Sequence, residues 1–364
     1  MDKKYLVSKV RCSSYDNEEV RGALVKSLKN IGFDLKKGKK ILLKPNVLCA
    51  SRPEDSITTH PVVLEELCKI LKAHGCEIII GDSSGFDTME AFEVSGILRL
   101  SKYATIIDFE KTEKKFFLLK ENKEIALPKI IFDVDLIINL PKLKTHLLTE
   151  VSLAVKNTFG CVPGKLKERY HKIYPSPDDF SRLIFDIYSL IKPGLNILDG
   201  VIGLEGKGPG TGGKSIRSNI IMSSTNAEAL DLIAAEFMGF SKEEVYTLIY
   251  SKIKKEDIEI IGDMKDINMK FKKPGFLSVK SIKPLVKSLP KPKINFNDNC
   301  RQCYRCEKKC PVNAIHLDPF PICNHNKCIR CLCCIEICPH NAISLKESYI
   351  TRTIKKFKNT LGRK

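Results

Sequence analysis

The chain has 364 residues, of which 43% are hydrophobic and 29% charged, a composition typical of about two globular domains that excludes the disordered and fibrous classes. Its net charge of +18 would suit a nucleic-acid binder, but the lysines are spread along the whole sequence instead of forming stripes, which argues against nucleic acid as a partner. No apolar run is long enough to cross a membrane, so we expect no transmembrane segment.

Short apolar runs alternate with helical patterns between residues 4 and 265. The runs that predict strands are Ile41–Leu43, Glu77–Ile80, Val134–Leu140, Leu195–Leu198 and Asn219–Met222. The patterns that predict helices are Pro61–His74, Thr88–Tyr103, Val151–Phe159 and Ala227–Met238. This alternation predicts an α/β domain over residues 1–269, with a mostly parallel sheet and helices on both faces.

Charged and amide side chains follow four of these predicted strands. In open α/β sheets ligands bind beyond the carboxyl ends of the strands, and lysines gathered there favour an anionic ligand such as a phosphate or carboxylate. Each side chain alone would be interpreted as solvated, but together they indicate a site. The predicted ligand-binding residues are Lys44, Asn46, Asp82, Ser83, Lys142, Lys156, Asn157, Asp199 and Glu205, and the catalytic candidates are Lys144 and His146.

Two other features of the large domain have competing interpretations. Cys161 could be a nucleophile only if His146 or His171, predicted to lie in a loop, is close enough to act as its base. The glycine-rich residues 200–213 formally match two phosphate-loop patterns, but a strand, not the helix that such loops need, is expected after them. A flexible lid over the strand-end site is the alternative for this segment.

Residues 270–296 are rich in Lys and Pro and predict a linker, and residues 349–364 form a basic tail. Both segments are expected to be solvated, with docking to an acidic redox partner protein or to an anionic membrane surface as the functional alternative.

Ten of the 15 cysteines lie between residues 300 and 338, where the spacing C-x2-C-x2-C-x3-C-P occurs twice. This spacing resembles that of bacterial two-cluster ferredoxins, in which three cysteines of one loop and a fourth from the other repeat hold each [4Fe-4S] cluster. Residues 297–348 are therefore predicted to form a small α+β domain with two [4Fe-4S] clusters. The predicted ligand sets are Cys300, Cys303, Cys306 and Cys338 for one cluster, and Cys328, Cys331, Cys334 and Cys310 for the other.

Zinc is the competing metal, but these runs of three cysteines do not divide into tetrahedral pairs. Cys323 and Cys333 are surplus to the pattern and are predicted to be packed thiols. Because no secretory leader opens the chain, we expect a cytoplasmic location, in which thiols bind metal more often than they form disulfides.

The chain as a whole resembles the iron-sulfur-centre proteins that carry domain of unknown function three-six-two. The matching segments are Lys44–Asn46, Thr58–Pro61, Gly81–Gly85, Lys142–His146, Lys156–Gly160, Asp199–Gly200 and Glu205–Pro209. The resemblance implies an α/β domain fused to a two-cluster ferredoxin, and it supplies no reaction or substrate.

The sequence therefore favours a redox protein whose clusters exchange electrons with a small anionic ligand in the α/β domain. The lysines would neutralise the ligand, His146 would donate a proton, and the carboxylates of Asp82, Asp199 and Glu205 would orient these groups or hold a cation. Two alternatives remain: an electron carrier whose large domain only docks a redox partner protein, and a carrier of iron-sulfur clusters.

Overall fold

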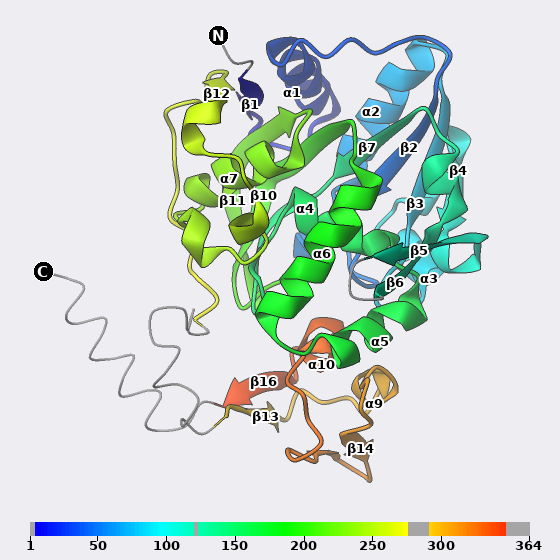
Figure 1. The fold of residues 1–364 in the computed structure, drawn as a ribbon, viewed down its shortest axis with the longest axis vertical. Helices are drawn as coiled ribbons and strands as arrows, with labels where there is room; N and C mark the ends of the chain where they lie inside the picture. Colours follow the sequence, from blue (N-terminus) through cyan, green and yellow to red (C-terminus); the bar gives the residue numbers. More distant parts are fainter. Residues whose placement is uncertain (1–3, 120–122, 276–290, 347–364) are drawn as a thin grey trace, which may run out of the picture.

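The computed structural model describes residues 4–119, 123–275 and 291–346. A ten-stranded sheet lies at the centre of the large domain, and most of its strand pairs are parallel (Figure 1). In chain order its strands are β1 (Tyr5–Arg11), β2 (Lys40–Pro45), β3 (Glu77–Asp82), β4 (Thr105–Asp108), β7 (Leu136–Leu140), β8 (Lys142–His146), β9 (Glu150–Ser152), β10 (Leu195–Gly206), β11 (Gly213–Ser224) and β12 (Ile258–Ile261). Their order across the sheet is β12-β1-β11-β10-β7-β2-β3-β4, with β8 paired to β10 and β9 paired to β8.

Helices cover both faces of this sheet, as the alternation of strands and helices predicts. The central strands β2, β3 and β7 are apolar and almost fully buried, which a strand between two helical layers requires. One layer consists of α1 (Asn17–Asn30), α2 (Pro61–Ala73) and α3 (Thr88–Val94), and the other of α4 (Ala154–Asn157), α6 (Pro177–Ile191) and α7 (Ala227–Phe237). Helix α5 (Gly164–Ile173) and the hairpin of β5 (Lys114–Leu119) and β6 (Lys123–Pro128) complete the domain.

Local sequence signals fix where the long helices begin. The carboxylate of Asp16 accepts hydrogen bonds from two backbone N–H groups at the start of α1, and the side chains of Ser176 and Asn226 do the same for one N–H each in α6 and α7. Proline occupies the first position of α2 and α6, where its missing N–H costs nothing.

Three predicted elements differ from the structure. The helix expected over Thr88–Tyr103 ends at Val94, because Gly96 adopts a positive φ of 74° and only a short 3-10 turn follows. The helix expected over Val151–Phe159 begins as strand β9 and becomes helical only at Ala154. The lysine-rich segment Lys142–His146, expected to follow a strand end, is itself strand β8, because it pairs with β10 and β9.

Residues 200–206 of the glycine-rich segment belong to β10, and residues 207–212 connect β10 to β11, so the expected strand, and no phosphate-binding helix, follows. The loop packs against the small domain: the Thr211 hydroxyl donates to the Cys338 carbonyl at 2.8 Å. A Cβ atom on Gly210 would lie 2.9 Å from the Glu336 carbonyl oxygen, so the contact needs glycine. The loop is therefore docked against the small domain, and its Pro209 also lines the cavity at the strand ends, so the lid interpretation stays a prediction.

The described part of the small domain contains two short two-stranded antiparallel sheets and two short helices. Its elements are β13 (Lys293–Phe296), α9 (Arg305–Lys308), β14 (Ile315–Leu317), β15 (Pro321–Cys323), α10 (Cys333–Ile337) and β16 (Ile343–Lys346). The two repeats share their backbone: Gln302, Tyr304 and Asn313 have positive φ, and so do their equivalents Arg330, Leu332 and Asn341. Strand β13 pairs with β16, so residues 293–296 belong to this domain and not to the linker.

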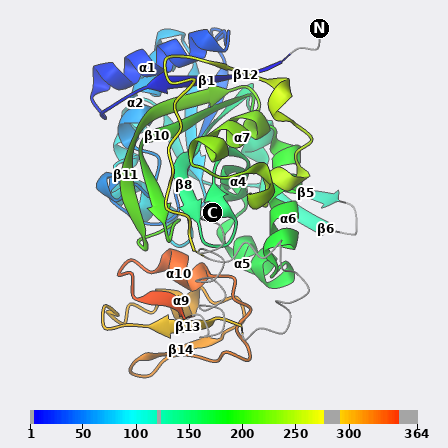
Figure 2. The same cartoon turned by 90° about the vertical axis from the view of Figure 1, so that its left-hand side faces the viewer.

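The small domain lies below the carboxyl ends of the central strands, against α5 and the β10–β11 hairpin (Figures 1 and 2). The ion pair between Arg305 and Glu90, 2.9 Å apart, joins the domains, and Arg305 also lies over the ring of Phe86 at 5.1 Å. A second ion pair joins Lys309 to Glu168 at 2.7 Å. The predicted tail and residues 276–290 of the predicted linker lie outside the described residues.

Candidate functional site

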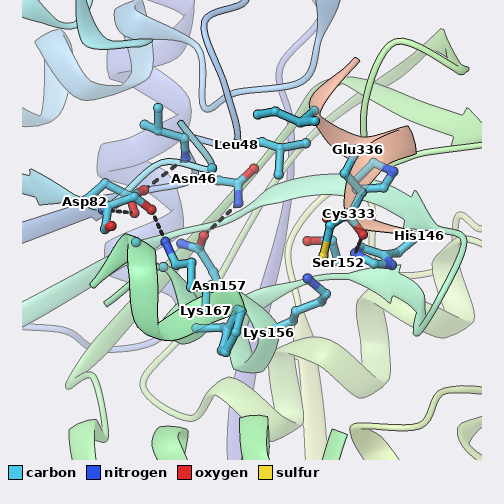
Figure 3. Close-up of a pocket in the computed structure, with 18 of the residues that line it drawn as sticks. Asn46, Leu48, Asp82, His146, Ser152, Lys156, Asn157, Lys167, Cys333 and Glu336 are labelled. Atoms are coloured by element: carbon cyan, nitrogen blue, oxygen red, sulfur yellow. Dashed lines mark hydrogen bonds and ion pairs between the residues drawn. The ribbon is translucent and has the colours of Figure 1, made fainter. Parts of the chain in front are cut away.

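A cavity of about 110 Å³ lies between the two domains, at the carboxyl ends of β2 and β3 (Figure 3). This volume has room for several water molecules or a small ligand. The predicted site residues that line it are Lys44, Asn46, Asp82, Ser83, Lys144, His146, Lys156 and Asn157. Other lining residues, which the strand-end argument had not included, are Ser152, Lys167, Glu168, His171, Lys309, Cys333 and Glu336.

One end of the cavity is formed by a buried ion pair. The Lys44 ammonium lies 2.9 Å from Asp82 Oδ2, and each side chain is 1% exposed. Burial raises the pKa of Asp82, whereas Lys44 and then Lys167 act to lower it. Lys167 donates to the Ser83 carbonyl, and burial lowers the pKa of Lys167 to about 8. Gly160 allows this close packing, since a Cβ there would lie 2.5 Å from Lys44 Nζ.

Two polar atoms at this end are buried and make no hydrogen bond among the described residues. Asn46 Nδ2 donates to Asn157 Oδ1 at 2.8 Å, and Asn157 donates in turn to Asn139 at 2.8 Å, so the amide chain is fixed in orientation. This chain leaves Asn46 Oδ1 without a partner, and the Ser83 hydroxyl is also unpaired. Because unpaired buried polar groups are costly, these atoms indicate where a ligand or ordered water binds.

His146 forms part of the other end of the cavity, and its tautomer is fixed by the backbone. The Leu148 and Thr149 N–H groups donate to His146 Nδ1 at 3.1 and 3.3 Å, so Nδ1 must be unprotonated and Nε2 must carry the hydrogen. Burial lowers the pKa of His146 well below its usual value, and Lys156 and Lys144 add to this effect. Nε2 lies 3.3 Å from Glu336 Oε1, but neither atom completes a hydrogen bond.

The fixed tautomer corrects the role expected for this histidine. A neutral imidazole that gave up its Nε2 proton would become an imidazolate, whereas it can donate a hydrogen bond without losing the proton. The fixed tautomer therefore disfavours His146 as a proton donor and leaves its Nε2–H able to donate a hydrogen bond.

Two lysines bring positive charge to the same end. Lys144 Nζ donates to the Ile57 carbonyl at 2.7 Å, and burial, assisted by Lys156, lowers the pKa of Lys144 to about 7. Lys156 lies in α4, and burial lowers its pKa while Glu336 acts to raise it.

Asp231 holds the start of α4 and so positions Lys156. Its carboxylate accepts from the Ala154 and Val155 N–H groups at 2.6 and 2.9 Å. Sequence reasoning missed this residue, although a carboxylate inside the apolar helix α7 was an available signal.

The small domain closes the cavity with Lys309 and with Cys333, Glu336 and Ile337 of α10. Figure 3 shows the Cys333 sulfur and the Glu336 carboxylate beside His146 and Ser152. Cys333, predicted to be a packed thiol, thus faces the cavity. Nothing in the sequence indicated these contributions, because they depend on how the two domains dock.

The cysteine repeats surround two smaller cavities. One is lined by Cys310, Cys328, Cys331 and Cys334, and the other by Cys300, Cys303, Cys306 and Cys338. These are the two crossed sets that the spacing predicts. In the described part of the chain, no group of three or more His, Cys, Asp or Glu is arranged to hold a metal ion.

Backbone N–H groups point at equivalent sulfurs in the two repeats. Ala314 donates to Cys310 Sγ at 3.1 Å and Ala342 to Cys338 Sγ at 3.4 Å. Such bonds stabilise and tune metal-bound thiolates, so this donor set fits cubane clusters.

Comparison with protein families agrees with this geometry. Residues 41–236, more than half of the chain, match the family described as "Domain of unknown function (DUF362)". The chain belongs to the DUF362 family. Residues 296–316 and 324–344 each match the "4Fe-4S binding domain", one match per repeat. The protein therefore combines a DUF362 domain with a module for two [4Fe-4S] clusters, and it is an iron-sulfur electron-transfer protein.

The "Thylakoid-associated protein sll1697" of Synechocystis sp. is similar to this DUF362 protein. The two are 30% identical over 248 residues, which cover 66% of this chain and 77% of the relative. Within the described ranges, no helix combines the length and apolar character that crossing a membrane requires.

Three predicted ligand-binding residues of the DUF362 domain do not reach the cavity. Lys142 Nζ lies 2.8 Å from Asp199 Oδ2 in a pair that is buried completely, and the Tyr15 hydroxyl contacts both at 2.7 and 2.8 Å. The ring of His60 stacks on Tyr15 with centroids 3.5 Å apart. Glu205 lies farther along β10, where it accepts from the Lys272 N–H at 2.7 Å. Lys142 and Asp199 therefore belong to a buried network with Tyr15, whereas Glu205 lines a different cavity.

Cys161 is also outside the cavity lining. It is 1% exposed, and burial raises the pKa of its thiol to about 12. A thiol that stays protonated is a poor nucleophile, so the geometry disfavours the catalytic interpretation. His171, expected in a loop, lies in α5 and stacks on Phe180 at 4.2 Å.

Proposed function

We propose that this DUF362 protein transfers electrons between its [4Fe-4S] clusters and a small anionic ligand bound in the interdomain cavity. One observation carries the proposal: helix α10 serves both sites. Its Cys334 faces a cysteine cavity, while Cys333 and Glu336 of the same helix line the interdomain cavity. A ligand in the interdomain cavity would therefore lie next to a cluster-binding loop.

The charge of the cavity supports an anionic ligand. Five lysines and three carboxylates line it. Asp82 pairs with Lys44 and Glu168 pairs with Lys309, so these charges offset one another. The remaining lining charges are Lys144, Lys156 and Lys167 against Glu336. Positive charge in excess and away from bulk water favours carboxylate or phosphate groups.

The clusters, when bound, supply electrons one at a time. The protein's part is to hold the ligand and stabilise the charge that it gains. We assign this stabilisation to the Nε2–H of His146, which is fixed in the cavity wall, and to the adjacent ammonium of Lys156. Lys144, whose pKa is about 7, is the proposed proton source near neutral pH.

Loss of a cavity lysine should strongly weaken binding of the anionic ligand. Protein purified without oxygen is expected to carry a small anion identifiable by mass spectrometry. Lys144→Met and Lys156→Met should each lower affinity for that anion about 10- to 100-fold, the usual worth of a hydrogen bond to a charged group. The matched control is Lys39→Met, whose ammonium pairs with Asp135 at an exposed site. Wild-type affinity and turnover in both cavity variants would refute the proposed site.

Anion affinity should also depend on pH. Lys144 is charged below its pKa of about 7 and neutral above it, so affinity should begin to fall above pH 7. The charged or titratable groups that act on it are Lys156, Cys49, Glu336 and Lys142, and a bound anion would extend its charged range upward. In Lys144→Met the fall should begin nearer pH 8, where Lys167 loses its proton. Calorimetric titration with sulfate, whose charge does not change over this pH range, measures the affinity at each pH. The same pH profile in the wild type and in Lys144→Met would contradict the prediction.

A further inference from the structure

Asn46 and Ser83 present polar side chains to the interdomain cavity from two neighbouring strand ends. Asn46 follows β2 and Ser83 follows β3, and both residues line the cavity. The parallel register of these strands, continued one residue past each, places Asn46 opposite Ser83. Beyond that point the Gly85 N–H donates to the Leu48 carbonyl at 2.8 Å, so the two segments stay side by side. Because opposed residues of a parallel pair project to the same face of a sheet, both side chains act on the same region of the cavity.

A chain of amides fixes which atom Asn46 presents to the cavity. Asn139 Nδ2 donates to the Ala154 carbonyl at 3.0 Å, and a carbonyl can only accept, so Asn139 Oδ1 is the atom that faces Asn157. Asn157 therefore donates to Asn139 and accepts from Asn46 Nδ2, each at 2.8 Å. This leaves Asn46 Oδ1 buried, and no described residue donates to it. The Ser83 hydroxyl, on a side chain 1% exposed, is unpaired in the same sense, so both atoms call for a ligand group.

Together, the amide oxygen and the serine hydroxyl select a hydroxyl group on the ligand. A ligand hydroxyl can donate to Asn46 Oδ1 and accept from the Ser83 hydroxyl at the same time. A carbonyl or carboxylate oxygen could not donate to Asn46. An ammonium group could donate, but it would meet the charges of Lys44 and Lys167, of which Asp82 can offset only one. An apolar group would leave both buried atoms without a partner.

We infer that the ligand of the interdomain cavity is a small hydroxy acid, whose hydroxyl binds between Asn46 and Ser83 while its anionic group binds at Lys144 and Lys156. The inference rests on the proposed function for the anionic group, and it adds the second functional group and the two residues that recognise it. Asn46 and Ser83 determine which acid is bound, and they take no part in moving electrons.

Anaerobic calorimetric titration of the intact holoprotein tests the inference with acids that differ by one hydroxyl. The pairs are propanoate with its 2-hydroxy and 3-hydroxy forms, butanoate with its 4-hydroxy form, and ethyl phosphate with 2-hydroxyethyl phosphate, so that the hydroxyl is offered at several distances from the charge. At least one hydroxy acid should bind about 10-fold or more tightly than its parent, because it gains two hydrogen bonds worth about 3- to 10-fold each. Equal affinity within every pair would overturn the inference, and so would binding of sulfate without binding of any hydroxy acid.

Two variants show whether the preference arises at the inferred residues. Ser83→Ala and Asn46→Leu should each lower the ratio of hydroxy-acid to parent-acid affinity about 3- to 10-fold. Ser83→Ala removes a single atom, so it keeps the test valid if Asn46→Leu disturbs the amide chain. The matched control is Ser181→Ala, which removes another buried hydroxyl without a partner, in α6 and outside the cavity lining.

An unchanged ratio in both Ser83→Ala and Asn46→Leu would overturn the inference. A failure of the proposed function looks different. If no anion binds, sulfate included, the anionic site itself is refuted, whereas binding of anions without a preference for the hydroxyl refutes only the hydroxy acid.

Discussion

Asp199→Ala should lower the free energy of unfolding of the DUF362 domain by about 3–5 kcal/mol, the cost of leaving a buried charge without its partner. Lys142 Nζ lies 2.8 Å from Asp199, and both side chains are inaccessible to solvent. The change also removes the acceptor of the Tyr15 hydroxyl and of the His60 N–H, which lies 2.9 Å from Asp199 Oδ2. Denaturant unfolding followed by circular dichroism measures the loss.

Two variants make this test specific. Asp135→Ala breaks a comparable pair with Lys39, but both of those side chains are 43% exposed, so the change should cost only a small fraction of that loss. The double variant Asp199→Ala/Lys142→Met removes both buried charges and should recover much of the loss. A loss below about 1 kcal/mol for Asp199→Ala alone would show that the network adds nothing to stability and would reopen a ligand-binding role for it.

Removal of the clusters should unfold the small domain and open the cavity. Few side chains of this domain are both apolar and fully buried, and several of the buried ones are the cysteines themselves. A domain this small cannot rely on its apolar core, so metal binding supplies its folding energy. Anaerobic chelation of iron should therefore abolish hydrogen-exchange protection across β13, α10 and β16.

The same experiment has an internal control. Amides of β2, β3 and β7 lie in the buried sheet of the large domain and should keep their protection after chelation. Bound anion should be released in parallel, because α10 carries one wall of the cavity. Persistent protection of α10 in iron-free protein would contradict the prediction and would mean that docking alone folds the domain.

The sequence predicted those parts of the site that depend on strand ends or on local spacing. Lys44 and Asp82 lie together because β2 and β3 are parallel neighbours whose carboxyl ends coincide. The crossed cysteine sets followed from spacing alone, since a loop with cysteine at every third position wraps only one face of a cluster.

Other contributions depend on contacts that no local pattern encodes. Lys142 and Lys144 are two residues apart on strand β8, yet only Lys144 reaches the cavity. Tyr15 and Asp199 occupy the space around Lys142. Lys167 comes from a helix, and Glu336 comes from the other domain. The tautomer of His146 likewise depends on where the fold places two backbone N–H groups, which no local sequence pattern shows.

Because of the loop between β10 and β11, neither domain should be replaceable by the corresponding domain of a relative without changing the other. Thr211 bonds to the backbone of Cys338, and Gly210 leaves no room for a side chain beside Glu336. The ferredoxin-like module is therefore matched in shape to a loop whose Thr211 lies 127 residues before the Cys338 that it contacts. A chimaera that imports only residues 291–346 from a relative should bind its clusters yet lose the cavity wall, whereas one that also imports residues 207–212 should restore it.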